Sequence, residues 1–432
     1  MLLTIISAVI ALSVLIIFHE FGHFIVAKRS GILVEEFSLG LGPKIIGIKK
    51  GDTTYRLSLI PLGGYVKLAG MEPKEVKGEP YEFAGKRPLI KIAVVLAGPV
   101  FNFVLAFFFF TLTTFIFGIP TLPTITVKSA VGTHHGASLQ PGDQILAING
   151  KEMQCWNDII KLLYTTDSSQ CIIKRDGEKL ELTLPKSLEI EPLISPIIGK
   201  VAKDGPAYRA GIQKGDLITK VVTEEITDEG TLKDTLEIKE WNTLVSVIRE
   251  NPEKELSIGW LHNGNYREAQ IVPDKEQALI DDEVKDIGVI KVLMEMGKEP
   301  IGISAFKIGF LQSVDTFILT LSFFKKLIFR KVSTKTLGGP IAIVKFVGES
   351  ARWGLESFFT LIAFLSINLL ILNIIPFPPL DGGQILLVLI EKIRRKPISE
   401  RTISLVQNIG FALLMMLIVY ISINDITRWI KK

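Results

Sequence analysis

The segment SVLIIFHEFGHFIVAKRS, residues 13–30, places three ionisable side chains in a run apolar enough to be a membrane helix. His19, Glu20 and His23 form an HExxH pattern in this run, and two basic residues close it. A charged group inside a membrane span costs about 2.5–3.5 kcal/mol, so such groups are rare there unless they have a function. The segment therefore predicts a membrane protein with a functional site in its first span.

The HExxH pattern is typical of a hydrolytic metal site. Residues four positions apart on an α-helix lie on one face, one turn above each other. His19 and His23 can therefore bind one metal ion, and Glu20 is close enough to accept a proton from a water molecule at that ion. The competing interpretation is that the span ends at Phe18 and that the three side chains are solvated and structural.

Composition supports a mixture of membrane spans and soluble portions. The chain has 432 residues, of which 48% are hydrophobic, and its mean hydropathy is +0.38. Uncharged apolar stretches long enough to span a bilayer cover residues 1–18, 92–118, 358–375 and 403–423. The first stretch lacks a basic start and a small-residue cleavage site, so we expect a retained span rather than a signal peptide.

The distribution of charge predicts the orientation of the chain. Residues 28–91 carry 12 Lys and Arg against 7 Asp and Glu, whereas residues 119–299 carry 21 against 30. The positive-inside rule places the basic loop in the cytoplasm, and the acidic block and both termini then lie outside. The basic residues lie next to the spans without interleaved aromatic residues, so no nucleic-acid partner is predicted.

A hydrolytic zinc site needs a third protein ligand, which leaves one position for water. His134, His135 and His262 lie in the block predicted on the far side, so they are poor candidates. Asp381, in NIIPFPPLDGGQ (373–384), is the better one, because the prolines interrupt the helix and hold a carboxylate at the cytoplasmic end. The alternative is an aspartate that only caps the following helix.

The loop between the first two spans predicts a β-hairpin or short meander. Lys50-Gly51-Asp52 is a turn signal, and residues 56–60 alternate polar and apolar side chains. Pro61 and the pair Gly63-Gly64 interrupt the pattern before Tyr65. Prolines and glycines mark sheet edges, so we expect one edge to stay open.

The acidic block contains an imperfect repeat. Residues 137–153 resemble residues 210–226, and each copy continues with a helical pattern, WNDIIKLLY or WNTLVSVIR, and a pair of strands. Two tandem copies of one β-rich module are predicted. Cys155 and Cys171 can form a disulfide in an oxidising compartment or remain unpaired core thiols. Residues 301–356 read as amphipathic, interfacial helices.

The HExxH pattern, AGPVFNFVLA (97–106), NIIPFPPLDGG (373–383) and the tandem modules together resemble the site-2 protease family, in its bacterial branch with two PDZ modules. The resemblance spans essentially the whole chain. It implies a polytopic α-helical membrane protein with four transmembrane helices, a membrane-associated β-hairpin and two tandem β-rich PDZ-like domains. The expected parts are 1–118 (two spans and the hairpin), 119–192 and 193–278 (PDZ-like), 279–356 (interfacial linker) and 357–432 (two spans).

The resemblance also assigns roles to residues. It implies a Zn²⁺ ion bound by His19, His23 and Asp381, with Glu20 as the general base. Asn373 matches an asparagine of the family, and its amide could hold substrate backbone or a developing oxyanion. The alternative for Asn373 is a hydrogen bond to a neighbouring span.

Two further assignments concern substrate binding and helix packing. Gly63, Gly64, Tyr65 and Val66 resemble the family's membrane-associated edge strand, which would bind an unwound substrate segment by β-addition. A hairpin that only braces the first two spans is the alternative. Asn102 in the second span either packs helices, together with Gly98, or acts directly in the site.

The resemblance implies an intramembrane zinc metalloendopeptidase of the bacterial cytoplasmic (inner) membrane, which acts in regulated intramembrane proteolysis. Its expected substrates are single-span proteins within the lipid bilayer, of the anti-sigma factor or remnant signal peptide type. An upstream site-1-type protease trims them first. The PDZ-like domains would lie outside and exclude untrimmed substrates, with the active site toward the cytoplasm. The alternatives are a non-catalytic membrane PDZ scaffold and, less favoured because the spans show no inverted repeat, a metal transporter.

Overall fold

The computed structural model describes residues 2–71, 73–131, 139–163, 168–185, 188–227, 230–280, 283–329, 338–396 and 398–430. The chain divides into two compact units. Residues 1–117 and 301–432 form what we call the helical unit, and residues 118–300 form the β unit. His134 and His135, which the sequence suggested as weak metal-ligand candidates, lie outside the described residues.

Within the residues that the structure describes, four helices are long and apolar enough to cross a membrane, which confirms the four predicted spans. They are α1 (Leu2–Arg29), α2 (Pro88–Phe117), α8 (Leu355–Ile374) and α10 (Glu400–Ile430). Pro88 opens α2, where its missing N–H and fixed φ suit the first turn of a helix. The spans therefore follow directly from the hydropathy of the chain.

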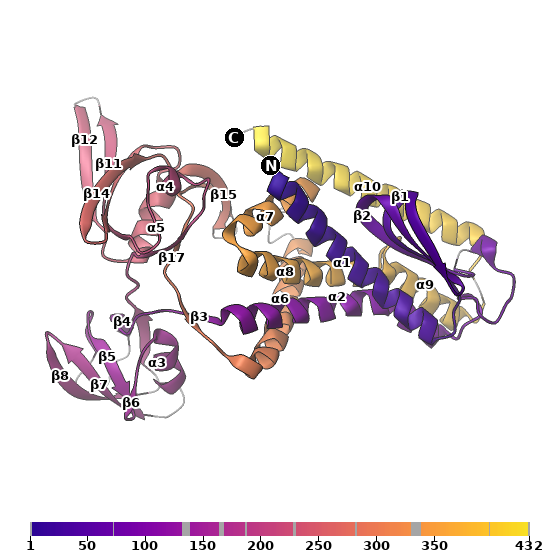
Figure 1. Ribbon diagram of the computed structural model, residues 1–432, viewed down its shortest axis with the longest axis horizontal. Coiled ribbons are helices and arrows are strands. Elements are labelled where there is room, and N and C mark those ends of the chain that lie inside the picture. The colour runs from indigo at the N-terminus through magenta and orange to yellow at the C-terminus, as the bar shows by residue number, and fades with distance from the viewer. Residues whose placement is uncertain are drawn as a thin grey trace. The chain divides into compact units, whose positions relative to one another are not determined.

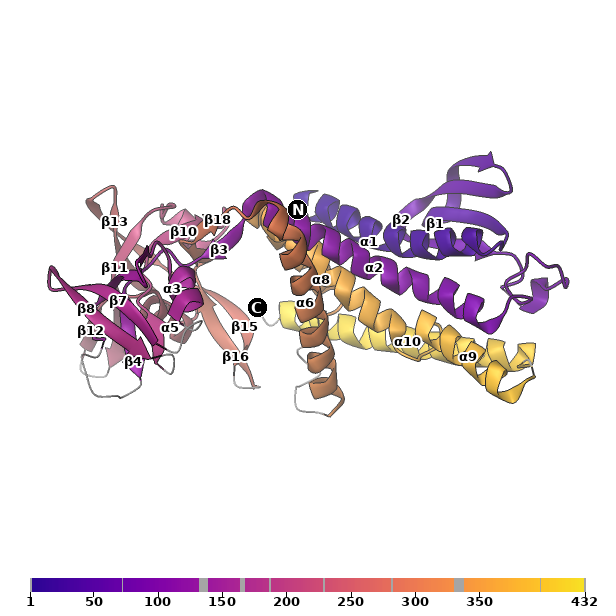
Figure 2. The same cartoon turned by 90° about the horizontal axis from the view of Figure 1, so that it is seen from below.

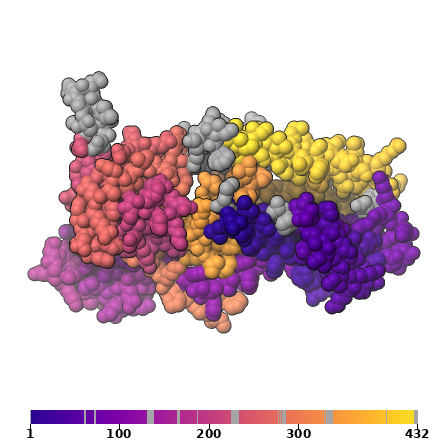
Figure 3. All heavy atoms as spheres, turned by 45° about the horizontal axis from the view of Figure 1, so that its top comes forward, coloured from indigo at the N-terminus to yellow at the C-terminus, as the bar shows by residue number. Residues whose placement is uncertain are grey.

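Three of these helices pack closely around small residues. Ala8 and Ala11 of α1 are buried together with Leu105 of α2 and Ile362 of α8. The fourth, α10, runs along the outside of the helical unit (Figures 1 and 3), and only 11% of its most apolar stretch is buried. The α1, α2 and α8 group therefore forms the rigid core of the helical unit.

Besides the spans, the described part of the helical unit contains three more α-helices, two of which lie between the second and third spans in the chain. Figure 2 shows α6 (Ala305–Ile328) crossing α2 and α8 steeply instead of running along them. The other, α7 (Pro340–Trp353), begins after Gly339, and Pro340 occupies its first turn. Its first turn is tied to α10, because the Asp425 carboxylate accepts from the backbone N–H groups of Gly339 and Ala342, each at 3.1 Å.

The predicted hairpin is part of a larger, bent sheet made of β1 (Val34–Lys50) and β2 (Thr53–Leu68). The turn joins Lys50 to Thr53, and Phe37 of β1 pairs with both Tyr55 and Val66 of β2. The end of β2 therefore lies on the opposite side of β1 from its beginning. No described strand pairs with the outer edge of this last segment, which lies beside the C-terminal half of α1 (Figure 1).

The β unit contains two four-stranded antiparallel sheets built in the same order. Neighbouring strands are hydrogen-bonded in the order β6-β5-β7-β8 in the first module and β12-β11-β13-β14 in the second. In each module a helix lies in the chain between the second and the third of the four strands. The elements of the first are β4 (Val127–Val131), β5 (Gln144–Ile148), β6 (Lys151–Glu152), α3 (Trp156–Leu163), β7 (Ser168–Arg175), β8 (Glu178–Pro185) and β9 (Glu189–Pro192). Those of the second include β10 (Ile198–Val201), α4 (Pro206–Arg209), β11 (Leu217–Thr227), β12 (Gly230–Glu237), α5 (Trp241–Glu250), β13 (Leu256–His262) and β14 (Asn265–Ile271). The repeated strand order matches the repeat read from the sequence.

The second module extends beyond residue 278, where the sequence suggested its end. That position lies inside β15 (Asp274–Ile280), which forms a hairpin with β16 (Glu283–Val289). The next strand, β17 (Val292–Met294), pairs with β10, and Ile290 joins the core of the module. These strands are short and rich in charge, so they lack the alternation that marks a strand in sequence. A last strand pair, β3 (Ile119–Thr121) with β18 (Gly297–Glu299), joins the beginning of the β unit to its end.

The two cysteines are both free. Cys155 donates to the Asp158 carboxylate at 3.4 Å. Cys171 is buried in the core of the first module, and this burial raises the pKa of its thiol to about 11. Of the two interpretations left open by the sequence, the structure therefore has the unpaired thiols.

An equivalent aspartate is buried in each module. Asp143 accepts from the Gln140 backbone N–H and from two nitrogens of Arg175, at 2.7 and 2.8 Å. Asp216 likewise accepts from the Gln213 N–H, and its other oxygen lies 2.7 Å from His262 Nδ1. The repeat thus preserves the turn and its buried carboxylate, while the side chain that pairs with the carboxylate changes from Arg175 to His262.

Replacing Arg175 by Gln should destabilise the first module, since Asp143 is only 1% exposed and would lose its partner. Burial alone raises the pKa of Asp143, but the guanidinium and the Gln140 N–H outweigh it and hold that pKa below its usual range. The stabilisation is present at neutral pH and is lost as pH falls through this lowered pKa. We expect a loss of about 3 kcal/mol, seen as roughly 100-fold faster amide hydrogen exchange in β5. The control Lys174→Gln, at an exposed neighbouring position, should leave exchange unchanged; equal exchange in both variants would contradict the prediction.

Candidate metal centre

The centre begins where α1 and α2 cross. A side chain on Gly22 would bring its Cβ within 2.4 Å of the Ala97 carbonyl oxygen, so the helices touch backbone to backbone there. On Gly98 a Cβ would lie 2.3 Å from His23 Nε2 and 2.7 Å from His19 Cε1. Glycine at position 98 therefore leaves the space that the two imidazoles occupy.

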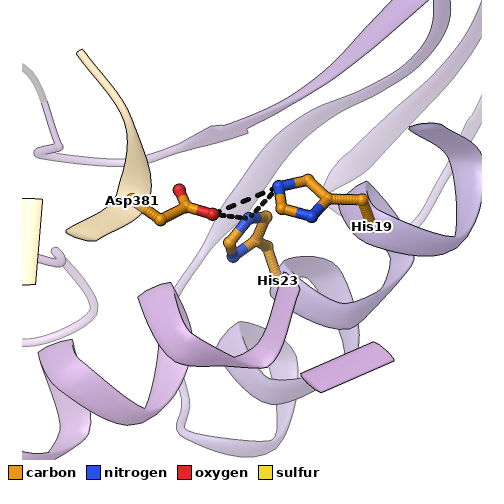
Figure 4. A group of neighbouring side chains, drawn as sticks. All are labelled: His19, His23 and Asp381. Atoms are coloured by element: carbon orange, nitrogen blue, oxygen red, sulfur yellow. Dashed lines mark hydrogen bonds and ion pairs between the residues drawn. The ribbon is translucent and has the colours of Figure 1, made fainter. Parts of the chain in front are cut away.

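The third group comes from the start of α9 (Asp381–Arg394), more than 350 positions away in the chain. The backbone folds back sharply before this helix, because a Cβ on Gly382 would lie 2.2 Å from the Ile374 carbonyl oxygen at the end of α8. The two glycines after Asp381 thus permit the close turn that the sequence suggested. This turn directs the Asp381 carboxylate toward α1 (Figure 4).

The three side chains converge on one point, as Figure 4 shows. His19 Nε2 and His23 Nε2 are 3.2 Å apart, and Asp381 Oδ2 lies 3.2 Å from the first and 3.5 Å from the second. Their side chains are only 10%, 13% and 14% exposed. Two imidazole nitrogens and a carboxylate oxygen are the donor set of many hydrolytic zinc sites.

The spacing of these donors suits a tetrahedral ion. With metal–ligand bonds of about 2.0–2.1 Å, the edge of such a tetrahedron measures about 3.3 Å. The measured separations of 3.2, 3.2 and 3.5 Å all lie close to that edge. The residues present therefore fit zinc, with the fourth corner left for water or substrate.

The protonation of His23 follows from its other nitrogen. His23 Nδ1 lies 2.8 Å from the Val94 carbonyl oxygen of α2. A carbonyl can only accept, so Nδ1 carries the proton and Nε2 presents a free lone pair to the centre. A backbone group thus orients this imidazole, as is usual for histidines that bind metals.

Two asparagines lie beside the other histidine. His19 Nδ1 is 3.1 Å from Asn102 Nδ2 and 3.5 Å from Asn373 Nδ2. Asn102 is fully buried in α2, and its backbone carbonyl accepts from the Ser366 hydroxyl of α8 at 2.8 Å. Asn373, near the end of α8, is partly exposed. The sequence left the role of Asn102 open, and the structure brings it directly to His19.

The end of β2 passes beside Glu20. A Cβ on Gly64 would lie 3.4 Å from Glu20 Cγ and 3.3 Å from Ile16 Cγ2 of α1. The strand that contains Gly63, Gly64, Tyr65 and Val66 therefore lies next to the HExxH helix.

A polar cluster anchors this strand to the rest of the sheet. Glu36 Oε2 accepts from the Tyr65 hydroxyl at 2.6 Å and from Arg56 Nη1 at 3.1 Å. The two donors, the hydroxyl first, hold the pKa of Glu36 below its usual range despite partial burial. The strand is thus fixed on its inner side, whereas its outer edge has no partner among the described strands.

Reasoning from the sequence found the residues that meet here but missed part of their surroundings. His19, His23 and Asp381 lie around one point, Asn373 lies beside His19, and Glu20 follows His19 in α1. The Val94 carbonyl and the exclusion of any side chain at position 98 were not foreseen. A backbone carbonyl leaves no residue-type signal, whereas the glycine lies in the AGPVFN segment that the sequence analysis had singled out.

The fold and this site define a membrane-embedded metallopeptidase. The model of Peptidase family M50 matches residues 7–417. The chain is similar to the regulator of sigma-E protease RseP of Escherichia coli, at 33% identity over 98% of each chain. It is also similar to the regulator of sigma E protease of Haemophilus influenzae (32% identity, 98% of each chain) and the zinc metalloprotease RasP of Oceanobacillus iheyensis (30% identity, 98% of this chain and 99% of the relative). The chain belongs to Peptidase family M50.

Membership defines the activity and the cofactor. The protein is an intramembrane zinc metalloprotease of the site-2 type, and the described part of the chain has four helices long and apolar enough to cross a membrane.

Proposed function

We propose that His19, His23 and Asp381 hold the catalytic zinc and that Glu20 is the general base. The observation that carries this proposal is the convergence of three buried donor atoms at separations of 3.2 to 3.5 Å. Asp381 Oδ2 is buried and lacks a hydrogen-bond partner of ordinary geometry, as expected of a ligand atom reserved for an ion.

Each residue beside the proposed zinc position has a separate role in amide hydrolysis. When bound, zinc supplies Lewis-acid activation of water and of the scissile carbonyl. Glu20 accepts the proton of the attacking water and then delivers it to the leaving nitrogen. The Asn373 amide donates to the carbonyl oxygen as negative charge develops on it. Asn373 suits this role because it is the more exposed of the two asparagines beside His19.

We further propose that the outer edge of Gly63, Gly64, Tyr65 and Val66 binds the substrate. A transmembrane helix satisfies its own backbone hydrogen bonds, so cleavage requires local unwinding. An open edge strand offers replacement backbone partners. The close approach of Gly64 to Glu20 supports this role, because a segment paired there lies within reach of the base.

Replacing Tyr65 by Phe should weaken substrate binding without altering the zinc content. The variant removes the hydroxyl that donates to Glu36 and so loosens the strand from its inner side. Losing this partly exposed bond costs about 1 kcal/mol, so we expect KM to rise roughly fivefold. Tyr55→Phe, in the same sheet, is the matched control and should leave KM unchanged. A Tyr65→Phe enzyme with wild-type KM would contradict a role for this strand in binding.

For the β unit we propose two PDZ-like domains, near 119–192 and 193–278 with the additional strands to residue 300, located outside the cytoplasmic membrane. They would admit substrates already trimmed by an upstream site-1-type protease, such as anti-sigma factors or remnant signal peptides. The repeated strand order and the acidic balance of the block support this. The basic 28–91 loop supports an active site toward the cytoplasm.

Cleavage of one single-span substrate in two forms tests the function. The full-length enzyme is reconstituted in liposomes with the substrate either intact or shortened on the extracytoplasmic side. We expect the shortened form to be cut within its span and the intact form to be cut at least about tenfold more slowly, by steric exclusion. Equal cleavage rates of the two forms would contradict the proposed exclusion of intact substrates. The alternative, a non-catalytic scaffold, predicts no cleavage of either form.

A further inference from the structure

Asn102 poses a hydrogen-bonding problem that the proposed zinc site resolves. As drawn, its Nδ2 faces His19 Nδ1 at 3.1 Å, while its Oδ1 is buried without any partner. An amide nitrogen only donates, so this orientation requires His19 Nδ1 to accept and its proton to lie on Nε2. A protonated Nε2 cannot bind a metal ion, although Nε2 is the atom that meets His23 and Asp381.

Turning the amide of Asn102 by 180° removes the conflict. The oxygen and nitrogen of an amide exchange places with almost no change in shape, and their assignment rests on the hydrogen-bond network. In the turned orientation Oδ1 takes the position 3.1 Å from His19 Nδ1 and accepts its N–H. Nδ2 takes the buried position that Oδ1 leaves, and His19 Nε2 is free of a proton and available to a metal ion.

The surroundings distinguish Asn102 from Asn373, the other amide beside this nitrogen. Asn102 is 0% exposed, lies 3.1 Å from His19 Nδ1, and is held in place through the bond from Ser366 to its backbone. Asn373 is partly exposed and lies 3.5 Å away. The buried amide therefore suits a permanent partner of the imidazole, and the exposed one remains available to substrate.

We propose that Asn102 is the positioning residue of the zinc site: its Oδ1 accepts the His19 Nδ1 proton and keeps Nε2 available to the ion. This inference rests on the proposed role of His19 as a ligand. It gives the two histidines equivalent support from α2, through the Val94 carbonyl for His23 and the Asn102 side chain for His19. A substitution can remove the Asn102 side chain, whereas the backbone carbonyl of Val94 is present in any variant.

The test measures zinc affinity by chelator competition in the full-length Glu20→Gln protein, so that proteolysis plays no part. Asn102→Leu keeps the number and branching of the side-chain heavy atoms but has no acceptor, and we expect it to bind zinc about 10–100-fold more weakly. Asn102→Asp keeps an acceptor and lacks a donor, so its affinity should stay within about threefold of the parent. Asn368→Leu, at a partly exposed asparagine of α8 whose amide donates to the Phe364 carbonyl of its own helix, is the matched control.

Each outcome has a defined meaning. Weakening in Asn102→Leu with rescue in Asn102→Asp supports the inference, because a purely structural asparagine would not be rescued by an acceptor alone. Wild-type affinity in Asn102→Leu, or equal weakening in both variants, overturns it. If the parent protein binds no zinc, the proposed function itself fails, and this is distinguished from failure of the inference alone.

Asn373→Leu provides the complementary measurement. Its zinc affinity should stay within about threefold of the parent, whereas in the active enzyme its kcat should fall by about 100-fold. If instead Asn373→Leu loses zinc and Asn102→Leu keeps it, the two roles are reversed and the proposal is wrong.

Discussion

Glu20→Gln should abolish proteolysis while leaving zinc in place. Glutamine matches the shape of glutamate but cannot accept the proton of the attacking water, and general-base catalysis contributes about 10²–10⁴-fold to such reactions. Glu20 is not among the three donors that converge on the ion, so the metal content should stay at the wild-type level. Cleavage of a trimmed single-span substrate and metal analysis of the same preparation provide the two readouts.

The control for this variant is Glu79→Gln, at an exposed carboxylate in the loop before α2. It should retain both activity and zinc. Substantial proteolysis by Glu20→Gln would remove Glu20 from the role of base. Loss of zinc in that variant would instead make the carboxylate a ligand.

Gly98→Val should prevent assembly of the metal centre. The first carbon of any side chain at this position would lie 2.3 Å from His23 Nε2 and 2.5 Å from His23 Cε1, well inside van der Waals contact. Either the imidazoles or the α1–α2 crossing must move, and neither movement preserves three donors on one tetrahedron. We expect zinc content below about one-tenth of wild type and no cleavage, since a zinc site tolerates displacements of only about 0.2 Å.

Ala93→Val is the matched control for Gly98→Val. Position 93 lies on the same helix and is exposed, so the same bulk meets no protein neighbour there that must move. The Ala93→Val protein should bind zinc and cleave substrate normally. A Gly98→Val protein with a full complement of zinc would show that the imidazoles are not confined as the structure has them.

Much of the fold follows from patterns that are local in the sequence. Hydropathy alone predicts the spans, because a helix that crosses a bilayer needs about 20 consecutive apolar residues. The HExxH pattern needs only one helical turn to bring His19 and His23 together. Asp381 was found because proline and glycine around it restrict the backbone in a way that the residue types reveal.

Other features depend on contacts between distant segments and leave no such pattern. The pairing of Phe37 with both Tyr55 and Val66 requires β2 to curve around β1, which alternation alone does not indicate. The strands after residue 274 are stabilised by partners such as β10 rather than by their own periodicity. The contact of Asn102 with His19 joins residues 83 positions apart, and nothing local distinguishes it from an asparagine that only packs helices.

Zinc-edge X-ray absorption of the full-length protein, compared with Asp381→Ala, tests the central claim most directly. The account predicts zinc in a shell of nitrogen and oxygen ligands at about 2.0–2.1 Å, with the imidazole signature of two histidines. In Asp381→Ala this shell should lose an oxygen, and the zinc content should fall. A sulfur-containing shell, or a spectrum and zinc content unchanged by removal of the carboxylate, would contradict a site built from His19, His23 and Asp381.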